Sequence, residues 1–451
     1  MTRILAAPYC IGPDTEVVEG FAVVYDQGRI LRFAPFAECR SAYPEAEILE
    51  RRDAVLSPGF VNAHMHLYGV LAHGITPPVG VDSFKGFLED YWWPLVENLL
   101  DPPMIAAAAR ASALELIESG VTSLCDVLEA PLAGPGGLAA EAAVLEELGL
   151  RAIVSTEACE RLSRATGILG LEENAAVIQQ YRRHGLIEGM MCTHTSFTCS
   201  EEFMKLACHR AEALGVGLQF HLNESRYEPD RCLEAHGLRS AEWYERIGIL
   251  SENILAAQGV QLSPAEMEIL ARRGVRMVHV PLSNCEVGGG VAPVPELLAA
   301  GIVCGLGTDG YINNFFELMR GAFLIHKGHR EDPTVMDART VWNMATEGGA
   351  DALHPGLGHG RLAPGAPADF VTIDISDLPS PVNTGNLTDQ LILFRNVSDV
   401  VDVVVAGRFL KQEGRLLAGD LGSARAESRR QAARLWDQGR AVARAGKGNL
   451  S

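Results

Sequence analysis

The feature that most constrains the fold is a regular alternation of two kinds of segment between about residues 58 and 310. Short apolar runs are separated by amphipathic stretches such as PPMIAAAARASALELIES (102–119) and SPAEMEILARRG (263–274). The short runs predict eight buried strands: PGFVNAHMH (58–66), VTSLCDV (121–127), RAIVSTEA (151–158), GMMCTHTS (189–196), GVGLQFHL (215–222), NILAAQG (253–259), VRMVHVPLS (275–283) and IVCGLGTDG (302–310). Strands that alternate with helices form parallel sheets, so the sequence predicts an α/β fold, a (β/α)8 TIM barrel.

The two ends of the chain have a different pattern. Residues 3–57 include the hairpin-like run EGFAVVYDQGRILRFA, with Gly28 in the turn. The runs ADFVTIDI and DVVDVVVAGRFLKQEGRLL follow near the C-terminus. We therefore expect a small β-sandwich domain built from both termini, with residues 1–57 and 362–451 flanking a barrel of residues 58–361. The Ala- and Arg-rich tail, from about 422 to 445, predicts a terminal helix.

Charge and cysteine content limit the partners and the compartment. The chain has 38 Lys+Arg against 57 Asp+Glu, a formal net charge of −19, which argues against nucleic acid or an anionic membrane as partner. It has no signal-peptide pattern at its N-terminus, and no run of about 18 apolar residues that would span a bilayer. The ten cysteines include no Cys-x-x-Cys pair. This predicts reduced thiols and a cytoplasmic protein.

Side chains that bind metals lie at the ends of three predicted strands. His64 and His66 end the first strand, His221 the fifth and Asp309 the eighth. Residues i and i+2 of a strand point to one face, and the carboxyl ends of barrel strands converge on one mouth. Three neutral nitrogens and one carboxylate suit a catalytic Zn²⁺ or Fe²⁺ with a position left for water. The sequence therefore predicts a metal centre with these four ligands.

Glu224 follows His221 by three residues and lies just past the same strand. A bound metal lowers the pKa of its water toward 7, and a nearby carboxylate can accept and redeliver the proton. We therefore expect Glu224 to act as an acid and base rather than as a metal ligand.

Several motifs together carry a resemblance to a known family. They are PGFVNAHMH, THTSFTCSEE, HLNES, GLRSAEWYERIGIL, PLSN, GTDG and GAPADFVTID. With them the chain resembles the metal-dependent amidohydrolase superfamily, and more narrowly its aminohydrolase and chlorohydrolase branch of heterocycle deaminases. The segments YINNFFELM, LEDYWWPL and LRAIVSTEACER are most similar to aminohydrolases associated with selenium-dependent purine catabolism.

The resemblance implies a role for each of the strand-end residues. It implies that His64, His66, His221 and Asp309 bind one divalent metal ion, Zn²⁺ or alternatively Fe²⁺. Glu224 matches the proton-shuttling glutamate, and His194, in THTSFT, matches a histidine that contacts substrate. It also implies a homodimer or a higher homo-oligomer.

Two further positions refine the comparison with the family. Two-metal members use a lysine on the fourth strand, and no lysine occurs between Lys85 and Lys205, which favours one metal. Family members usually have a histidine at the end of strand six, where this chain has Gln258. An amide can donate a hydrogen bond but cannot carry a proton. We expect Gln258 to contact substrate or water, and His279 is itself a family feature rather than its replacement.

The function that the resemblance implies is hydrolytic deamination of a small nitrogen heterocycle, such as a purine, pterin or pyrimidine, by a metal-activated water. Glu224 would protonate a ring nitrogen, and Asp309 would orient the water and pass a proton to the departing ammonia. Further candidates to line the substrate pocket are Trp92, Trp93, Glu157, Asn284 and Asn313.

Two other functions stay open. One is hydrolysis of a different bond, as in a triazine-type chlorohydrolase, an alkylamine hydrolase or a cyclic amidohydrolase. The other is a barrel that keeps its metal but has lost turnover, for which Gln258 is the reason. Release of ammonia, chloride or a carboxylic acid separates the enzymatic cases, and turnover separates them from the binding protein.

Overall fold

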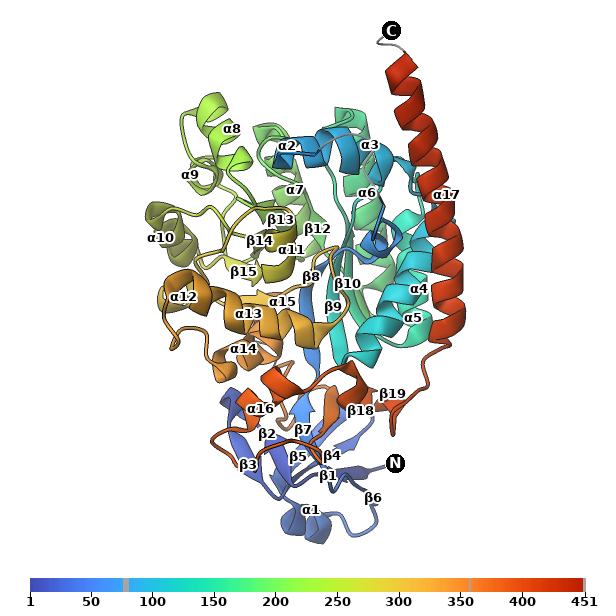
Figure 1. The fold of residues 1–451 in the computed structure, drawn as a ribbon, viewed down its shortest axis with the longest axis vertical. Coiled ribbons are helices and arrows are strands. Elements are labelled where there is room, and N and C mark those ends of the chain that lie inside the picture. The colour runs from blue at the N-terminus through green and yellow to red at the C-terminus, as the bar shows by residue number, and fades with distance from the viewer. Residues whose placement is uncertain (76–80, 357, 449–451) are drawn as a thin grey trace.

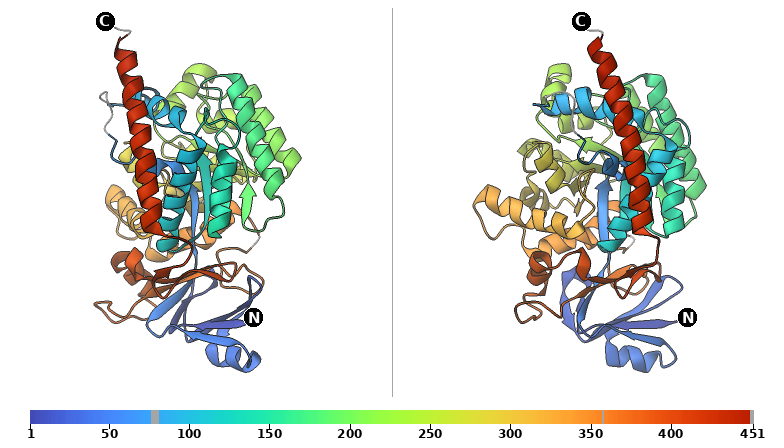
Figure 2. Two further views of the ribbon diagram at one scale, coloured as in Figure 1. Left: turned by 90° about the vertical axis from the view of Figure 1, so that its right-hand side faces the viewer. Right: turned by 45° about the vertical axis from the view of Figure 1, so that its right-hand side comes forward.

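The computed structural model describes residues 1–75, 81–356 and 358–448. A barrel forms the middle of the molecule, a small β-domain lies at one end of it, and the last helix runs along its side (Figures 1 and 2). The predicted TIM barrel with a terminal sheet domain is confirmed. None of the described helices combines the length and the hydropathy that a membrane crossing needs.

The barrel sheet contains nine parallel strands among the described residues, in the order β11-β10-β9-β8-β16-β15-β14-β13-β12. Their bounds are β8 Phe60–Met65, β9 Val121–Leu128, β10 Arg151–Thr156, β11 Ile187–Gly189, β12 Met191–Cys192, β13 Leu218–Leu222, β14 Ile254–Gln258, β15 Arg276–His279 and β16 Cys304–Leu306. The predicted fourth strand is divided at Met190, so that β11 pairs with β10 and β12 with β13. A bridge between Ala158 and Thr193 joins these two sides and closes the barrel.

Helices surround the barrel strands, which are almost entirely buried, as expected for a parallel sheet. The helices of this layer are α4 Pro102–Glu118, α5 Gly137–Leu148, α6 Arg164–Tyr181, α7 Glu201–Leu214, α8 Tyr227–His236, α9 Ser240–Arg246, α10 Pro264–Arg273, α11 Pro281–Glu286, α12 Val294–Ala299, α13 Phe315–Arg330, α14 Ala338–Ala345 and α15 Glu347–Leu353. Several begin at a side-chain cap; the Asp101 carboxylate, for example, accepts from the Met104 amide at the start of α4.

The small domain consists of two sheets, with strand orders β5-β4-β1-β6 and β20-β19-β18-β17-β7-β2-β3. Its strands are β1 Arg3–Ala6, β2 Tyr9–Ile11, β3 Val17–Glu19, β4 Phe21–Asp26, β5 Arg29–Pro35, β6 Glu47–Glu50, β7 Ala54–Pro58, β17 Phe370–Asp374, β18 Val400–Val405, β19 Arg408–Gln412 and β20 Arg415–Leu416. Its helical segments are η1 Pro13–Thr15, α1 Phe36–Ala42, α16 Leu387–Phe394 and η5 Val397–Asp399. The predicted hairpin is β4–β5, and both its turn residues, Gln27 and Gly28, have positive φ. Since β7 pairs with β17, both termini contribute to one sheet.

The chain passes from the small domain to the barrel at Gly59, between β7 and β8. A Cβ at Gly59 would lie 2.1 Å from the Thr122 Oγ1, so only glycine fits this crossing. Leu362 is buried in a hydrophobic cluster that is otherwise formed by small-domain residues. These two observations support the division that we propose, into residues 1–57, 58–361 and 362–451.

An irregular segment between β8 and α4 lies at the carboxyl end of the barrel (Figure 1). It contains η2 Leu67–Leu71, α2 Phe84–Gly86, η3 Phe87–Trp92, α3 Trp93–Leu95 and η4 Glu97–Leu99. The terminal helix α17, Leu421–Gly448, packs against this segment and against α4. Trp436 of α17 donates to the Leu71 carbonyl over 2.7 Å, so the last helix holds the segment in place.

Candidate metal centre and active site

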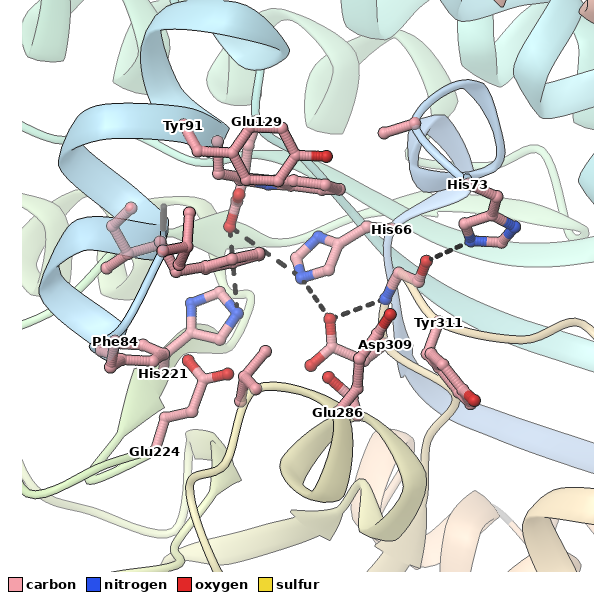
Figure 3. Close-up of a pocket in the computed structure, with 18 of the residues that line it drawn as sticks. His66, His73, Phe84, Tyr91, Glu129, His221, Glu224, Glu286, Asp309 and Tyr311 are labelled. Carbon is pink, nitrogen blue, oxygen red and sulfur yellow. Dashed lines mark hydrogen bonds and ion pairs between the residues drawn. The ribbon is translucent and has the colours of Figure 1, made fainter. Parts of the chain in front are cut away.

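A cavity of about 300 Å³ opens at the carboxyl end of the barrel strands (Figure 3). Its described lining combines four histidines, four carboxylates and a largely apolar wall. The polar residues are His66, His73, His194, His221, Glu129, Glu224, Glu286 and Asp309, and the aromatic residues are Phe84, Phe87, Tyr91, Trp92 and Tyr311.

Three buried histidines from two strands converge beside this cavity. Among the described residues, ring nitrogens of His64, His66 and His221 all lie within 4.8 Å of one another. Asp309 completes the group, because its Oδ1 lies 3.2 Å from the His66 Nε2. The Asp309 amide also donates to the His64 carbonyl over 3.2 Å, which holds the carboxylate beside β8. The four residues predicted as metal ligands therefore lie together.

The donor atoms of this group fit a divalent cation. The His66 Nδ1 hydrogen-bonds the Val127 carbonyl over 2.7 Å, which fixes its proton there and leaves Nε2 as an acceptor. Both ring nitrogens of His64 are buried without a hydrogen-bond partner. Burial also holds the pKa of His64 well below its usual value, so the ring is neutral, the form that binds metal. A cation would satisfy nitrogens that otherwise lack a partner.

The Asp309 carboxylate is held by two donors in addition to its contact with His66. The Gly310 amide donates to its Oδ1 over 2.6 Å, and the Gln258 Nε2 donates to its Oδ2 over 2.6 Å. Burial would raise the pKa of Asp309, but the neighbouring histidines, His66 first, bring that pKa below its usual range. Asp309 is therefore an anion. Gln258 lines the cavity, as predicted for a substrate contact, and its amide group is used to orient Asp309.

The backbone is strained where it enters the cavity. Asn223, Gln258 and Asp309, which follow or end β13, β14 and β16, have φ values of 50°, 84° and 56°. Positive φ is costly for residues other than glycine and persists where the surrounding structure enforces it, often at functional sites. Two of these three side chains, Gln258 and Asp309, line the cavity, whereas the Asn223 amide donates to Glu266 over 3.0 Å.

Glu224 and His194 line the cavity beside the metal-binding group. Burial raises the pKa of Glu224 well above its usual value, and the charges of Asp309 and Glu129 raise it further. Burial therefore favours the protonated form of Glu224. His194 shares a 2.7 Å hydrogen bond with Thr198 through Nδ1, and burial lowers its pKa to about 3. Its neutral ring can exchange hydrogen bonds with a ligand.

The other predicted pocket residues differ in position. Trp92 lines the cavity and donates to the Tyr68 hydroxyl over 3.3 Å, and Trp93 lies against the Arg161 guanidinium. Asn313 is not among the described lining residues, since its amide turns to Glu115 of α4 at 2.8 Å.

Two more predicted residues act from behind the lining. Asn284 donates to the Gln258 Oε1, on the far side from Asp309. Glu157 also lies outside the described lining, with its Oε2 3.5 Å from the His221 Nδ1. Together with His194 and His221 it forms a second group of possible ligand atoms.

Glu129, which immediately follows β9, was not predicted as a site residue from the sequence. Its Oε1 lies 3.9 Å from the Nε2 of both His66 and His221, and its Oε2 accepts from Tyr68 over 2.7 Å. The signal was available, because a carboxylate directly after a buried strand is the pattern that identified Asp309. The predicted strand stopped at Val127, one residue before the end of β9 and two residues before Glu129. His73 and Tyr311 were missed because they lie on loops without a periodic pattern, and Glu286 because it ends the short helix α11.

The sequence of this chain is similar to those of known proteins. A family model described as "Amidohydrolase family" matches residues 55–410. The chain is 32% identical to a 5-methylthioadenosine/S-adenosylhomocysteine deaminase of Thermococcus sibiricus, over 80% of this chain and 83% of the relative. It is 30% identical to a 5'-deoxyadenosine deaminase of Methanopyrus kandleri, over 90% of this chain and 92% of the relative.

Solved structures of similar fold include proteins named as a deaminase and as a chlorohydrolase. An adenosine deaminase from Xanthomonas campestris with bound zinc superposes with a TM-score of 0.85 and 26% identity, over 96% of this chain and 98% of that one. An atrazine chlorohydrolase from Arthrobacter aurescens superposes with a TM-score of 0.82 and 21% identity, over 95% and 99% of the two chains, a likeness of fold alone.

Proposed function

The chain belongs to the amidohydrolase family, and from this premise we propose that it is a metal-dependent hydrolase that deaminates a purine-type heterocycle. Relatives at 30% and 32% identity act on adenosine derivatives, as their names state. The observation that carries the proposal is the convergence of three buried histidines and Asp309 beside a cavity that Glu224 also lines.

In this proposal His64, His66, His221 and Asp309 would hold one divalent cation. Bound there, the cation supplies Lewis-acid activation of a water molecule at neutral pH. We propose zinc, which the similar Xanthomonas structure contains, with iron as the alternative.

The remaining steps belong to the side chains. Glu224, protonated because of its burial, donates a proton to the ring nitrogen next to the amine-bearing carbon, which makes that carbon a better electrophile. Asp309, an anion held by Gln258 and Gly310, accepts a proton from the attacking water and passes it to the departing amine. As the C–N bond breaks and the carbonyl group forms, the proton of the new hydroxyl group passes to the Glu224 carboxylate and restores its protonated form. Neutral His194 hydrogen-bonds the ring, and Trp92, which stacks on Phe87 at a centroid distance of 5.3 Å, offers it an apolar wall.

The test combines metal analysis with an ammonia-release assay on adenosine, 5'-deoxyadenosine and 5'-methylthioadenosine, extended to free purines, pterins, pyrimidines and triazines. We expect one divalent ion per chain and ammonia from an adenine derivative, with activity lost on chelation and restored by the metal. His221→Asn should lose both metal and turnover, whereas His209→Asn, at an exposed position of α7, should keep both.

Three results would contradict the proposal. They are full activity without metal, release of chloride or a carboxylic acid in place of ammonia, and a metal-loaded protein that turns over none of these compounds. The second would favour the triazine or cyclic-amide alternatives, and the third a barrel that binds without turnover.

We further propose a cytoplasmic homo-oligomer that binds neither nucleic acid nor membrane. The cysteines are all free in the part of the chain that the structure describes, which fits a reducing compartment. The net charge of −19 disfavours polyanionic partners. Leu324 of α13 and Leu393 and Phe394 of α16, two helices in contact, are exposed apolar side chains suited to an interface between copies. Light scattering in solution tests the oligomeric state.

A further inference from the structure

The described wall of the cavity carries carboxylates and no lysine or arginine. Glu129, Glu224 and Asp309 lie close to the metal-binding histidines, and Glu286, an exposed residue at the end of α11, lies beside Asp309 (Figure 3). Because burial favours the protonated form of Glu224, a divalent cation would offset two of the other three carboxylates. The cavity therefore offers an anionic group no positive partner other than the metal itself.

Two basic side chains close to the cavity, Arg161 and Lys85, pair with groups outside it. The buried Arg161 guanidinium donates to Glu97 over 2.5 Å and to Asn98 over 2.8 Å. Lys85, next to the lining residue Phe84, is exposed and pairs with Glu89 at 3.7 Å. Residues 76–80, TPPVG in the sequence, contain no lysine or arginine.

Much of the remaining described lining is apolar, although His73 is a polar neighbour of Glu286. Ile75, Val81, Phe84 and Tyr91 contribute side chains to it. A substituent that projects from the reacting ring toward the opening would meet these apolar groups together with one carboxylate. Moving a phosphate or carboxylate from water into such surroundings loses hydration and adds repulsion, whereas an apolar or cationic group gains contacts.

We propose that the cavity selects heterocycles whose substituent is uncharged or cationic and rejects those that carry phosphate or carboxylate, with Glu286 as the specificity-determining residue. This inference rests on the proposed deaminase function and narrows its substrate class. The names of the relatives include both kinds of compound: the 5' groups of 5'-deoxyadenosine and 5-methylthioadenosine are uncharged, whereas S-adenosylhomocysteine carries an amino-acid carboxylate.

The test measures kcat/KM for adenosine derivatives that differ only at the 5' position. We expect 5'-deoxyadenosine, 5'-methylthioadenosine and 5'-amino-5'-deoxyadenosine to lie within about tenfold of one another, and adenosine 5'-monophosphate to lie lower by about 100-fold. S-adenosylhomocysteine should fall between these groups. A monophosphate that reacts as well as 5'-deoxyadenosine would overturn the inference.

Charge reversal tests Glu286 itself. Glu286→Lys should raise kcat/KM for the monophosphate relative to 5'-deoxyadenosine by about tenfold, because a repulsive charge becomes an attractive one. Glu286→Gln should give a smaller rise. The control Glu202→Lys makes the same change of net charge at an exposed position of α7 outside the described lining, and should leave the ratio unchanged. An unchanged ratio in Glu286→Lys would remove Glu286 from the inference.

A binding measurement separates this inference from the proposed function. If none of the compounds in the ammonia-release assay is deaminated, the deaminase proposal fails on its own. Charge selection is then measured by titrating the fluorescence of 2-aminopurine riboside and of its 5'-monophosphate with the metal-loaded protein. Binding of the riboside at least about tenfold more tightly supports the inference. Equal or tighter binding of the monophosphate, or binding of neither compound, contradicts it.

Discussion

Gln258 connects two other polar side chains because its amide group both accepts and donates. Asn284 donates to its Oε1, and its Nε2 donates to the Asp309 Oδ2 over 2.6 Å. In the sequence, Gln258 is a departure from the family's usual histidine, and its amide cannot carry a proton. The structure gives the neutral amide a definite task, which is to orient the carboxylate that would accept the proton of the attacking water.

Removing that amide should lower turnover. Gln258→Leu leaves Asp309 without a charge-assisted hydrogen bond worth about 1.5–3 kcal/mol, so we expect kcat to fall by about 10- to 100-fold with little change in KM. Gln258→His, which keeps a donor, should retain most of the turnover. Steady-state kinetics with metal analysis measures both. If Gln258→His is instead much faster than the natural enzyme, the site is a degenerate one.

Glu157 is placed to orient a metal ligand rather than to contact substrate. Its Oε2 lies 3.5 Å from the His221 Nδ1, whereas the His221 Nε2 faces Glu129 on the cavity side. A carboxylate behind a ligating histidine fixes the ring and its tautomer.

We therefore expect Glu157→Gln to weaken metal affinity by about 10- to 100-fold and to leave kcat per bound metal nearly unchanged. Competition with a fluorescent chelator measures the affinity. Glu172→Gln, at an exposed position on α6, is the matched control. Unchanged metal affinity with a raised KM would return Glu157 to the substrate-contact role that the sequence suggested.

At the scale of elements, regular patterns could be predicted from the sequence and packing-dependent ones could not. The period-two alternation of β8 and the barrel geometry suffice to bring His64, His66 and His221 together. The terminal helix was also predicted, and α17 confirms it. In contrast, the short helical turns between β8 and α4 have no periodic signal, since their conformation depends on α17, which is distant in sequence. The break at Met190 could not be predicted either, because it depends on how the two sides of the barrel meet when the sheet closes.

The contact between α17 and this segment should tune substrate binding. Leu71 precedes the lining residues Ala72 and His73, so Trp436→Phe, which removes only the hydrogen bond to the Leu71 carbonyl, should raise KM by about fivefold while kcat stays nearly constant. Hydrogen exchange in the segment should rise in parallel. Arg440→Ala, which removes an exposed intrahelical ion pair of α17, is the control. A fall in kcat with unchanged KM would contradict a role of this contact in substrate binding.

At the scale of the whole molecule, several buried histidines outside the active site link stability to pH. Burial lowers the pKa of His326, His354 and His359 to about 4 in each case. The unfolded chain, with histidine pKa values near 6.5, therefore binds more protons than the folded one between about pH 6.5 and 4. Stability contributed by the neutral folded rings is complete above pH 6.5 and is lost as the pH falls through this window.

Replacing one of these histidines should reduce the slope of the free energy of unfolding against pH. Each proton difference contributes about 1.4 kcal/mol per pH unit to the free energy of unfolding, so His354→Asn should flatten the profile between pH 6.5 and 4.5 by up to this amount. Urea unfolding at several pH values measures the slope, which is independent of any general loss of packing. His209→Asn, at an exposed position, should keep the slope of the natural protein. A profile unaffected by His354→Asn would mean that this histidine does not titrate in the window.

The pairing of β7 with β17 limits when the small domain can fold during synthesis. Ala54 of β7 lies opposite Asp374 of β17. Because β7 is synthesised long before β17, the two strands cannot pair until most of the chain has been made. Until that partner arrives, one edge of β7 has no backbone to bond, and such an edge attracts other chains. During synthesis, the barrel can therefore close while the small domain is still incomplete. We expect chaperones to bind the nascent chain mainly in this interval.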